Sequence, residues 1–99
     1  MLELGRQGEN LARTVRINVS RWYEEYGNDI TISLLVQRPN ETTDYYPEIT
    51  ISNGILNWKV TTFDSTNSGF GLAQIIITNN EGLIAKSEKY KTFVSASMS

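Results

Sequence analysis

Apolar and polar residues alternate along most of this chain, and turn-forming residues interrupt the alternation at intervals of about eight to twelve positions. Alternation of this kind places every second side chain on the same face of a β-strand, so that one face packs into a core while the other contacts water. The clearest run contains Ile30, Ile32, Leu34 and Val36. Repeated short runs are typical of an all-β sandwich or barrel.

We predict seven strands and no long helix. The strands cover about residues 11–19, 29–37, both arms of a hairpin over 46–61, 70–78, 83–86 and 90–97. The hairpin prediction depends on Asn53-Gly54, because this dipeptide between two alternating runs is the strongest local sign of a tight turn. The pattern therefore predicts an immunoglobulin-like antiparallel β-sandwich, with a closed barrel as the alternative.

The length of 99 residues fits one domain. Residues 1–10 are mostly polar and contain two glycines, which predicts a flexible N-terminal arm. Residues 11–99 then form the single sandwich domain. Trp58, in the middle of a predicted strand, is the best candidate for the central aromatic residue of the core.

Three segments without alternation predict local turns and loops. Residues 20–28 predict one helical turn, capped by Ser20 and ended at Gly27-Asn28. Residues 39–44 predict a loop, and in the crossover loop after residue 62 Asp64 or Ser65 caps a single turn. In the following strand we favour a core face made by Ala73, Ile75 and Ile77, and we expect its glycines, Gly69 and Gly71, to permit a close crossing or a bulge.

The composition excludes several kinds of chemistry. The chain has no Cys and no His, so a thiol nucleophile, a disulfide, an imidazole base and an ordinary zinc site are all ruled out. Its net charge of −2 argues against a nucleic-acid surface. Carboxylate chemistry and oxygen-ligand metal sites remain. Asp44 and Glu48 could share a cleft, but we favour ordinary surface charges for the eleven acidic residues, and the loop Asp64 to Asn67 has a single carboxylate where a calcium site needs several oxygen ligands. We therefore predict no enzyme, no catalytic residue, no cofactor and no metal site.

Aromatic residues in the two irregular segments form the candidate interaction surface: Trp22, Tyr23, Tyr26, Tyr45 and Tyr46. Such side chains anchor protein partners or stack on sugar rings, because their faces are apolar and their edges form hydrogen bonds. The plainer interpretation is that Trp22 closes one end of the sandwich and the tyrosines cover its rim. Only Arg21 is interleaved with these aromatics, which argues against single-stranded nucleic acid.

Four stretches, taken in order, resemble a known family: Gly8 to Thr14, Ser33 to Pro39, Gly54 to Trp58, and Gly69 to Gln74 followed by Ala85-Lys86-Ser87. This order resembles small β-sandwich domains in tail-module proteins of phages and prophages of Gram-positive hosts. The most similar family is the N-terminal domain of phage baseplate upper proteins. The resemblance covers about residues 9–97. Two features depart from it: the chain stops at Ser99, where such proteins usually continue, and the segment Trp22 to Tyr26 has no counterpart of known role.

The resemblance implies a non-enzymatic structural module of the phage virion, in the tail or baseplate, which acts by protein–protein docking. It implies other tail or baseplate proteins as partners and leaves association of copies open. We expect synthesis in the bacterial cytoplasm without a signal peptide, and no membrane, since no apolar run is longer than three residues, as at Ile75-Ile76-Ile77. The alternative is a carbohydrate-binding module for host cell-surface glycans, with Trp22, Tyr45 and Tyr46 as stacking faces.

Overall fold

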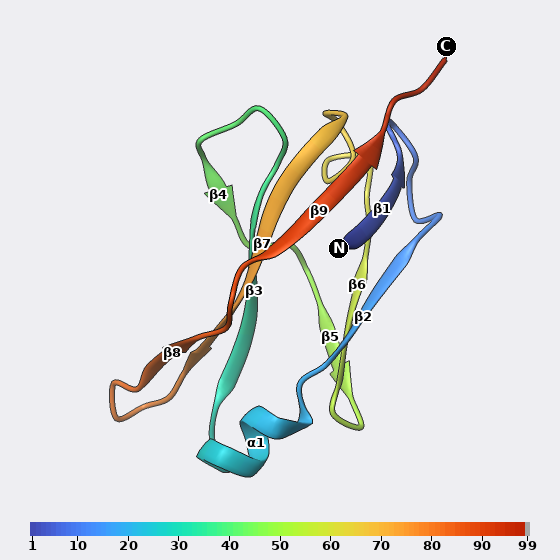
Figure 1. Cartoon of the computed structure of the whole chain (residues 1–99). Coiled ribbons are helices and arrows are strands. Elements are labelled where there is room, and N and C mark those ends of the chain that lie inside the picture. Colours follow the sequence, from blue (N-terminus) through green and yellow to red (C-terminus); the bar gives the residue numbers. More distant parts are fainter. Residues whose placement is uncertain (99) are drawn as a thin grey trace.

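The computed structural model describes residues 1–98 as two β-sheets that face each other, with one short helix across an end (Figure 1). The elements are β1 (Leu2–Arg6), β2 (Thr14–Asn18), α1 (Ser20–Tyr26), β3 (Thr31–Gln37), β4 (Asp44–Tyr45), β5 (Thr50–Ser52), β6 (Ile55–Lys59), β7 (Gly69–Thr78), β8 (Ile84–Lys86) and β9 (Tyr90–Ser95). The large sheet has the order β1-β9-β7-β3-β4, with β8 also beside β7, and the small sheet has the order β2-β6-β5. The predicted all-β sandwich is confirmed.

The strand order is that of an immunoglobulin-like sandwich. Counted along the chain, β2, β6 and β5 take the places of strands B, E and D, while β3, β7 and β9 take those of C, F and G. Nearly all pairs are antiparallel, as predicted, but β1 runs parallel to β9. The first strand therefore closes the edge of the large sheet next to the last strand.

The N-terminal segment corrects the prediction of a flexible arm over residues 1–10. Residues 2–6 form β1, and Leu4 is only 2% exposed. The amide of Gln7 continues the contact by donating to the Ser95 carbonyl at 2.8 Å. Leu2 and Leu4 both pack on the core, and their alternation over only three residues was too short to identify a strand. The partner strand lies at the far end of the sequence, so no local turn signal announces the pairing.

Residues 1–98 form nine strands instead of the predicted seven, because the prediction missed β1 and β4. β4 begins at Asp44, inside the predicted loop, and pairs with β3 through Tyr45↔Val36 and Asp44↔Gln37. The predicted hairpin is confirmed: β5 pairs with β6, and Asn53 and Gly54 have φ angles of 52° and 75°. Two successive positive φ values are those of the tight hairpin turn that Asn-Gly favours.

The predicted helical turn is α1, but its capping differs from the prediction. Ser20 is the first helical residue and the N-cap position belongs to Val19, which gives no side-chain cap. Asn18 supports this end instead, because its Oδ1 accepts from the amide and the hydroxyl of Ser20. The other end is as predicted: Gly27 has a φ of 85°, and its amide donates to the Tyr23 carbonyl.

The core lies between the two sheets and is made by the inward positions of both. Trp58 is fully buried in the small sheet, and Ala73, Ile75 and Ile77 form the inward face of β7 as predicted. The buried apolar cluster is completed by Leu4, Val15, Val19, Trp22, Ile32, Leu34, Val36, Leu56, Val60 and Val94.

Gly71 marks a place where the sheet has no room for a side chain. A Cβ added there would lie 2.5 Å from the Gln37 carbonyl oxygen and 2.8 Å from Thr92 Oγ1. The close crossing that the glycines of this segment predicted is therefore present at Gly71, between β3 and β9.

Replacement of Trp58 by alanine should destabilise the domain by about 3–5 kcal/mol, because it removes the largest fully buried side chain of the core. This is comparable to the whole stability of a small domain. Urea unfolding followed by circular dichroism measures the loss. Ile84→Ala is the control: its side chain is 66% exposed, so a cost within about 0.5 kcal/mol is expected. Equal costs for the two variants would contradict this core.

Candidate functional site

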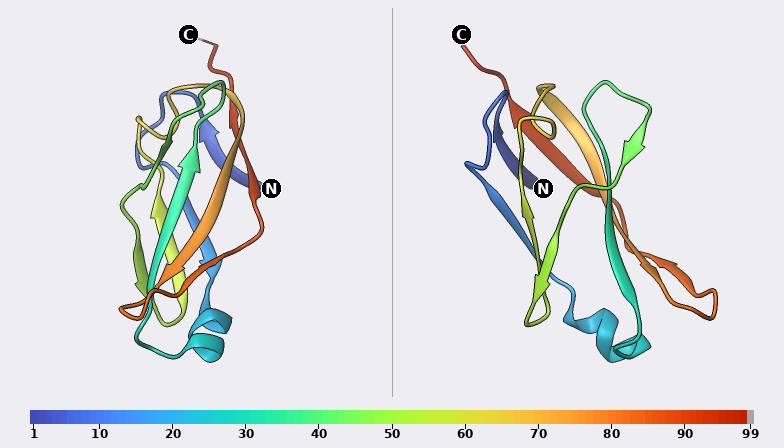
Figure 2. Two further views of the ribbon diagram at one scale, coloured as in Figure 1. Left: turned by 90° about the vertical axis from the view of Figure 1, so that its left-hand side faces the viewer. Right: turned by 180° about the vertical axis from the view of Figure 1, so that it is seen from behind.

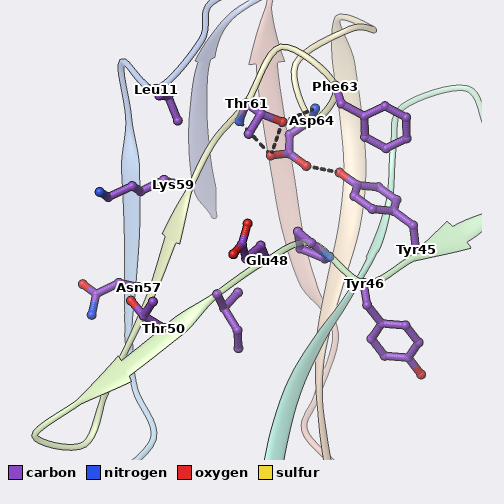
Figure 3. A pocket seen from close by; sticks show the side chains of 12 residues that line it. Leu11, Tyr45, Tyr46, Glu48, Thr50, Asn57, Lys59, Thr61, Phe63 and Asp64 are labelled. Carbon is purple, nitrogen blue, oxygen red and sulfur yellow. Dashed lines mark hydrogen bonds between the residues drawn. The ribbon is translucent and has the colours of Figure 1, made fainter.

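The buried carboxylate of Asp64 joins the two sheets at one edge of the sandwich. Asp64 is 3% exposed. Its Oδ2 accepts from the indole Nε1 of Trp58 at 3.1 Å and from the amide and hydroxyl of Thr61 at 2.8 and 3.0 Å. Its Oδ1 accepts a short hydrogen bond from the Tyr45 hydroxyl, drawn in Figure 3. Trp58 belongs to the small sheet and Tyr45 to the large one, so the carboxylate bridges them.

Asp64 reaches this position through a capping box. The Thr61 hydroxyl accepts from the Asp64 amide, while the Asp64 carboxylate accepts from the Thr61 amide. This is the reciprocal arrangement of an N-cap residue and the residue three positions later. The prediction that Asp64 or Ser65 would be the cap was wrong: Thr61 is the cap, and Ser65 closes the turn by donating its amide to the Thr61 carbonyl.

Tyr45 is held neutral by these surroundings. Burial raises the pKa of its phenol well above the ordinary value, and the hydrogen bond and negative charge of Asp64 raise it further. The ring of Tyr45 also packs edge-on against Phe63, with ring centres 4.9 Å apart. The guanidinium of Arg38 covers the Phe63 ring at 4.0 Å and donates to the Phe63 carbonyl. Tyr45 therefore serves as part of the sandwich, with its hydroxyl already occupied.

An open groove of about 630 Å³ lies outside this cluster. Figure 3 shows the side chains around it. Its apolar lining comes from Leu11, Tyr46, Pro47, Ile49 and Phe63, and its polar lining from Glu48, Thr50, Asn57 and Lys59, with Tyr45, Thr61 and Asp64 at one end. The volume lies within the usual range of ligand clefts, about 300–1,000 Å³.

The groove exists because β5 follows β6 for only three residue pairs. The pairing stops at Thr50↔Asn57, and residues 46–49 lead away toward the large sheet. Among residues 1–98, no strand pairs with Lys59 on this side, whereas Thr14 of β2 lies opposite it on the other. The Val60 amide donates to the Arg13 carbonyl, on the β2 side of the strand. Because the backbone groups of successive strand residues point to opposite sides, the amide and carbonyl of Lys59 point into the groove.

The five aromatic residues predicted as an interaction surface fall into two separate groups. Trp22, Tyr23 and Tyr26 lie on α1 and pack against the core, and Trp22 is only 9% exposed. The parallel rings of Trp22 and Tyr26 are 6.2 Å apart. In the other group Tyr45 points to Asp64 while Tyr46 points away and is 63% exposed (Figure 3). Of the five, Tyr46 alone offers an open ring to the groove.

Sequence reasoning missed the polar side of this site. The sequence predicted only a capping role for Asp64, and it did not identify Asn57 or Lys59 as candidate site residues. The sequence Thr61-Thr62-Phe63-Asp64 does carry a signal, since its spacing is that of a capping box just after an alternating run. The sequence carries no such signal for the partner of Asp64 Oδ1, because Tyr45 reaches this oxygen from the other sheet.

In comparisons with known proteins, no family model and no curated protein matches this chain. Within residues 1–98 no helix is long and apolar enough to cross a membrane. In the same residues, no three acidic, histidine or cysteine side chains gather into a group that could hold a metal ion. Fold and groove together define an all-β, immunoglobulin-like domain with an open groove at one edge.

Replacement of Tyr45 by phenylalanine should cost about 1–2 kcal/mol at neutral pH, because the Asp64 carboxylate loses a buried donor. The variant should also be less sensitive to alkali. In the folded chain the raised pKa keeps the phenol protonated, so its contribution is complete below about pH 10, the unfolded pKa, and is lost as the pH rises toward the folded value.

Urea unfolding at several pH values between neutral and alkaline measures both effects. The stability of the unmodified chain should fall more steeply above pH 10 than that of Tyr45→Phe. Tyr46→Phe is the control, because it removes the same hydroxyl from a tyrosine that is 63% exposed. Parallel pH profiles for the unmodified chain and Tyr45→Phe would contradict the buried hydrogen bond.

Proposed function

We propose that this chain is a non-enzymatic structural module of a phage or prophage tail or baseplate, and that it works by docking onto another virion protein. One observation carries the docking proposal: the open groove lies beside Lys59 of β6, whose groove-facing amide and carbonyl have no strand partner among residues 1–98. The virion setting is supported by the resemblance of residues 9–97 to phage tail-module domains.

The partner that best fits the groove is an extended peptide segment. The pairing of β5 with β6 ends at Thr50↔Asn57, so β5 does not reach Lys59. A peptide segment that paired with Lys59 would take this vacant place in the small sheet. Its side chains would contact the apolar lining on one side, with Tyr46 and Ile49, and the polar lining on the other, with Glu48 and Asn57. Main-chain hydrogen bonds supply affinity in this mode, and the side-chain pockets supply specificity.

The non-enzymatic part of the proposal is supported by the residues available for catalysis. The chain contains no His and no Cys. Its one deeply buried carboxylate, Asp64, already accepts four hydrogen bonds. A carboxylate engaged in this way serves the fold and is poorly placed to exchange a proton with a substrate.

Lys59→Pro tests the docking edge most sharply. Proline removes the Lys59 amide that points into the groove and leaves the hydrogen bonds of β6 to β2 in place. The free variant should therefore keep its stability within about 1 kcal/mol and lose at least about tenfold in affinity for tails or baseplates of the source phage. Lys59→Ala is the matched control, since it removes the same side chain and retains the amide.

Binding is measured by cosedimentation of the purified chain with the particles. Equal affinity of Lys59→Pro and Lys59→Ala would show that the groove edge is not the docking site. Antibody labelling tests the setting itself: an antibody against the chain should label tails or baseplates in electron micrographs. Unlabelled virions from the source phage would contradict the virion proposal whatever the groove variants do.

A glycan is the second candidate occupant, and the exposed ring of Tyr46 favours it. Tyr46 stands at one end of a groove that also has polar lining residues such as Glu48 and Asn57, so a sugar stacked on the ring could extend toward hydrogen-bonding side chains (Figure 3). Trp22 offers no such face, because it is buried in α1. A glycan array probed with the unmodified chain and with Tyr46→Ala separates the candidates: binding that Tyr46→Ala abolishes supports the sugar, and no binding removes it.

A further inference from the structure

The outer face of the large sheet is a second surface, separate from the groove. The left panel of Figure 2 looks onto the middle of β3, β7 and β9, while the β8 hairpin projects toward the viewer at the lower end of this face. Because Ala73, Ile75 and Ile77 point inward, the alternate positions of β7 point outward. Phe70 is 59% exposed and Leu72 is 36% exposed.

The cross-strand neighbours extend this apolar surface. Phe70 lies opposite Phe93 of β9, and their ring centres are 5.0 Å apart. The ammonium of Lys91 stands 5.2 Å from the centre of the Phe70 ring, so it is held over the sheet. Toward β3, Leu35 lies opposite Gln74 and contributes to a hollow of about 300 Å³.

One row across this face has an acidic end and a basic end. The register pairs Asp44 with Gln37, Gln37 with Leu72, and Leu72 with Lys91, so the four residues lie side by side across β4, β3, β7 and β9. Neither Asp44 nor Lys91 has an ion-pair partner among residues 1–98. Lys86 and Lys89 border the same hollow and add positive charge on the side of β8 and β9.

A row of this kind is complementary to itself. Consider a second copy placed face to face with the first by a two-fold axis that runs parallel to the strands, between β3 and β7. Its row then lies over the first row in the opposite order. Asp44 then faces the partner's Lys91, Lys91 faces the partner's Asp44, and the apolar and amide side chains of the middle meet. Two-fold interfaces are the commonest in soluble oligomers, and each contact in them occurs twice.

We propose that two copies of this chain associate face to face through the outer surface of the large sheet, with Asp44 of each opposite the partner's Lys91. The available area is adequate. The strands of this sheet contain 33 residues, which at a rise of about 3.3 Å and a spacing of about 4.8 Å give roughly 500 Å² per partner; the total of roughly 1,000 Å² is at the lower limit for a specific interface. The proposal is independent of the groove, so failure of either leaves the other standing.

Charge reversal at the two ends of the row tests this geometry. Asp44→Lys places two like-charged pairs in a dimer of identical chains, and so does Lys91→Asp. Each single variant should dimerise at least about tenfold more weakly than the unmodified chain. In a mixture of the two variants, every facing pair has opposite charges again, so the mixture should recover the affinity that both components lack. Sedimentation equilibrium over a range of concentrations measures all four samples.

A second pair of variants tests the apolar part and controls for general surface effects. Leu72→Asp should abolish the dimer, because it places charge at the centre of the interface. Leu11→Asp should leave it unchanged, since Leu11 is 58% exposed but lines the groove. The proposal is overturned by a chain that stays monomeric at all concentrations, which would leave this face to another occupant. A dimer that neither single variant weakens, or a mixture that fails to recover, overturns it too.

Discussion

The buried carboxylate of Asp64 connects the two sheets of this domain to each other and to the turn that follows β6. Asp64 receives hydrogen bonds from the core tryptophan of the small sheet, from the turn that follows β6, and from Tyr45 of the large sheet. An unpartnered carboxylate in such a place would cost several kcal/mol. The groups that donate hydrogen bonds to Asp64 must therefore stay close to it. This requirement holds β4, which carries Tyr45, next to the turn after β6, which carries Thr61.

The groove follows from the same constraint. Tyr45 points inward to reach Asp64, so Tyr46 points outward, and the chain that follows approaches β6 only at Thr50. The gap exposes the Lys59 backbone. The structural centre and the proposed docking edge are thus two consequences of one hydrogen-bonded cluster. The outer face of the large sheet belongs mainly to other strands, so the two proposed interaction surfaces are independent of each other.

Most of the fold could be predicted because its signals are local. Asn53-Gly54 defines its hairpin, and the alternation around Trp58 and Ile75 identifies inward faces within a few residues. β1 could not be predicted, because its partner β9 is almost the whole chain away. The site was harder still. Tyr45 and Tyr46 are adjacent and alike in sequence, yet one is buried and one exposed, and only the position of Asp64 in the fold decides which.

The bridge between the sheets is tested most directly by a double-mutant cycle on Tyr45 and Asp64. Urea unfolding of Tyr45→Phe, Asp64→Asn and the double variant gives their coupling energy, which isolates the interaction from the separate effects of each change. The account predicts a coupling of about 1–2 kcal/mol, so that the double variant is less destabilised than the sum of the two single variants. Costs that add within about 0.5 kcal/mol would contradict it.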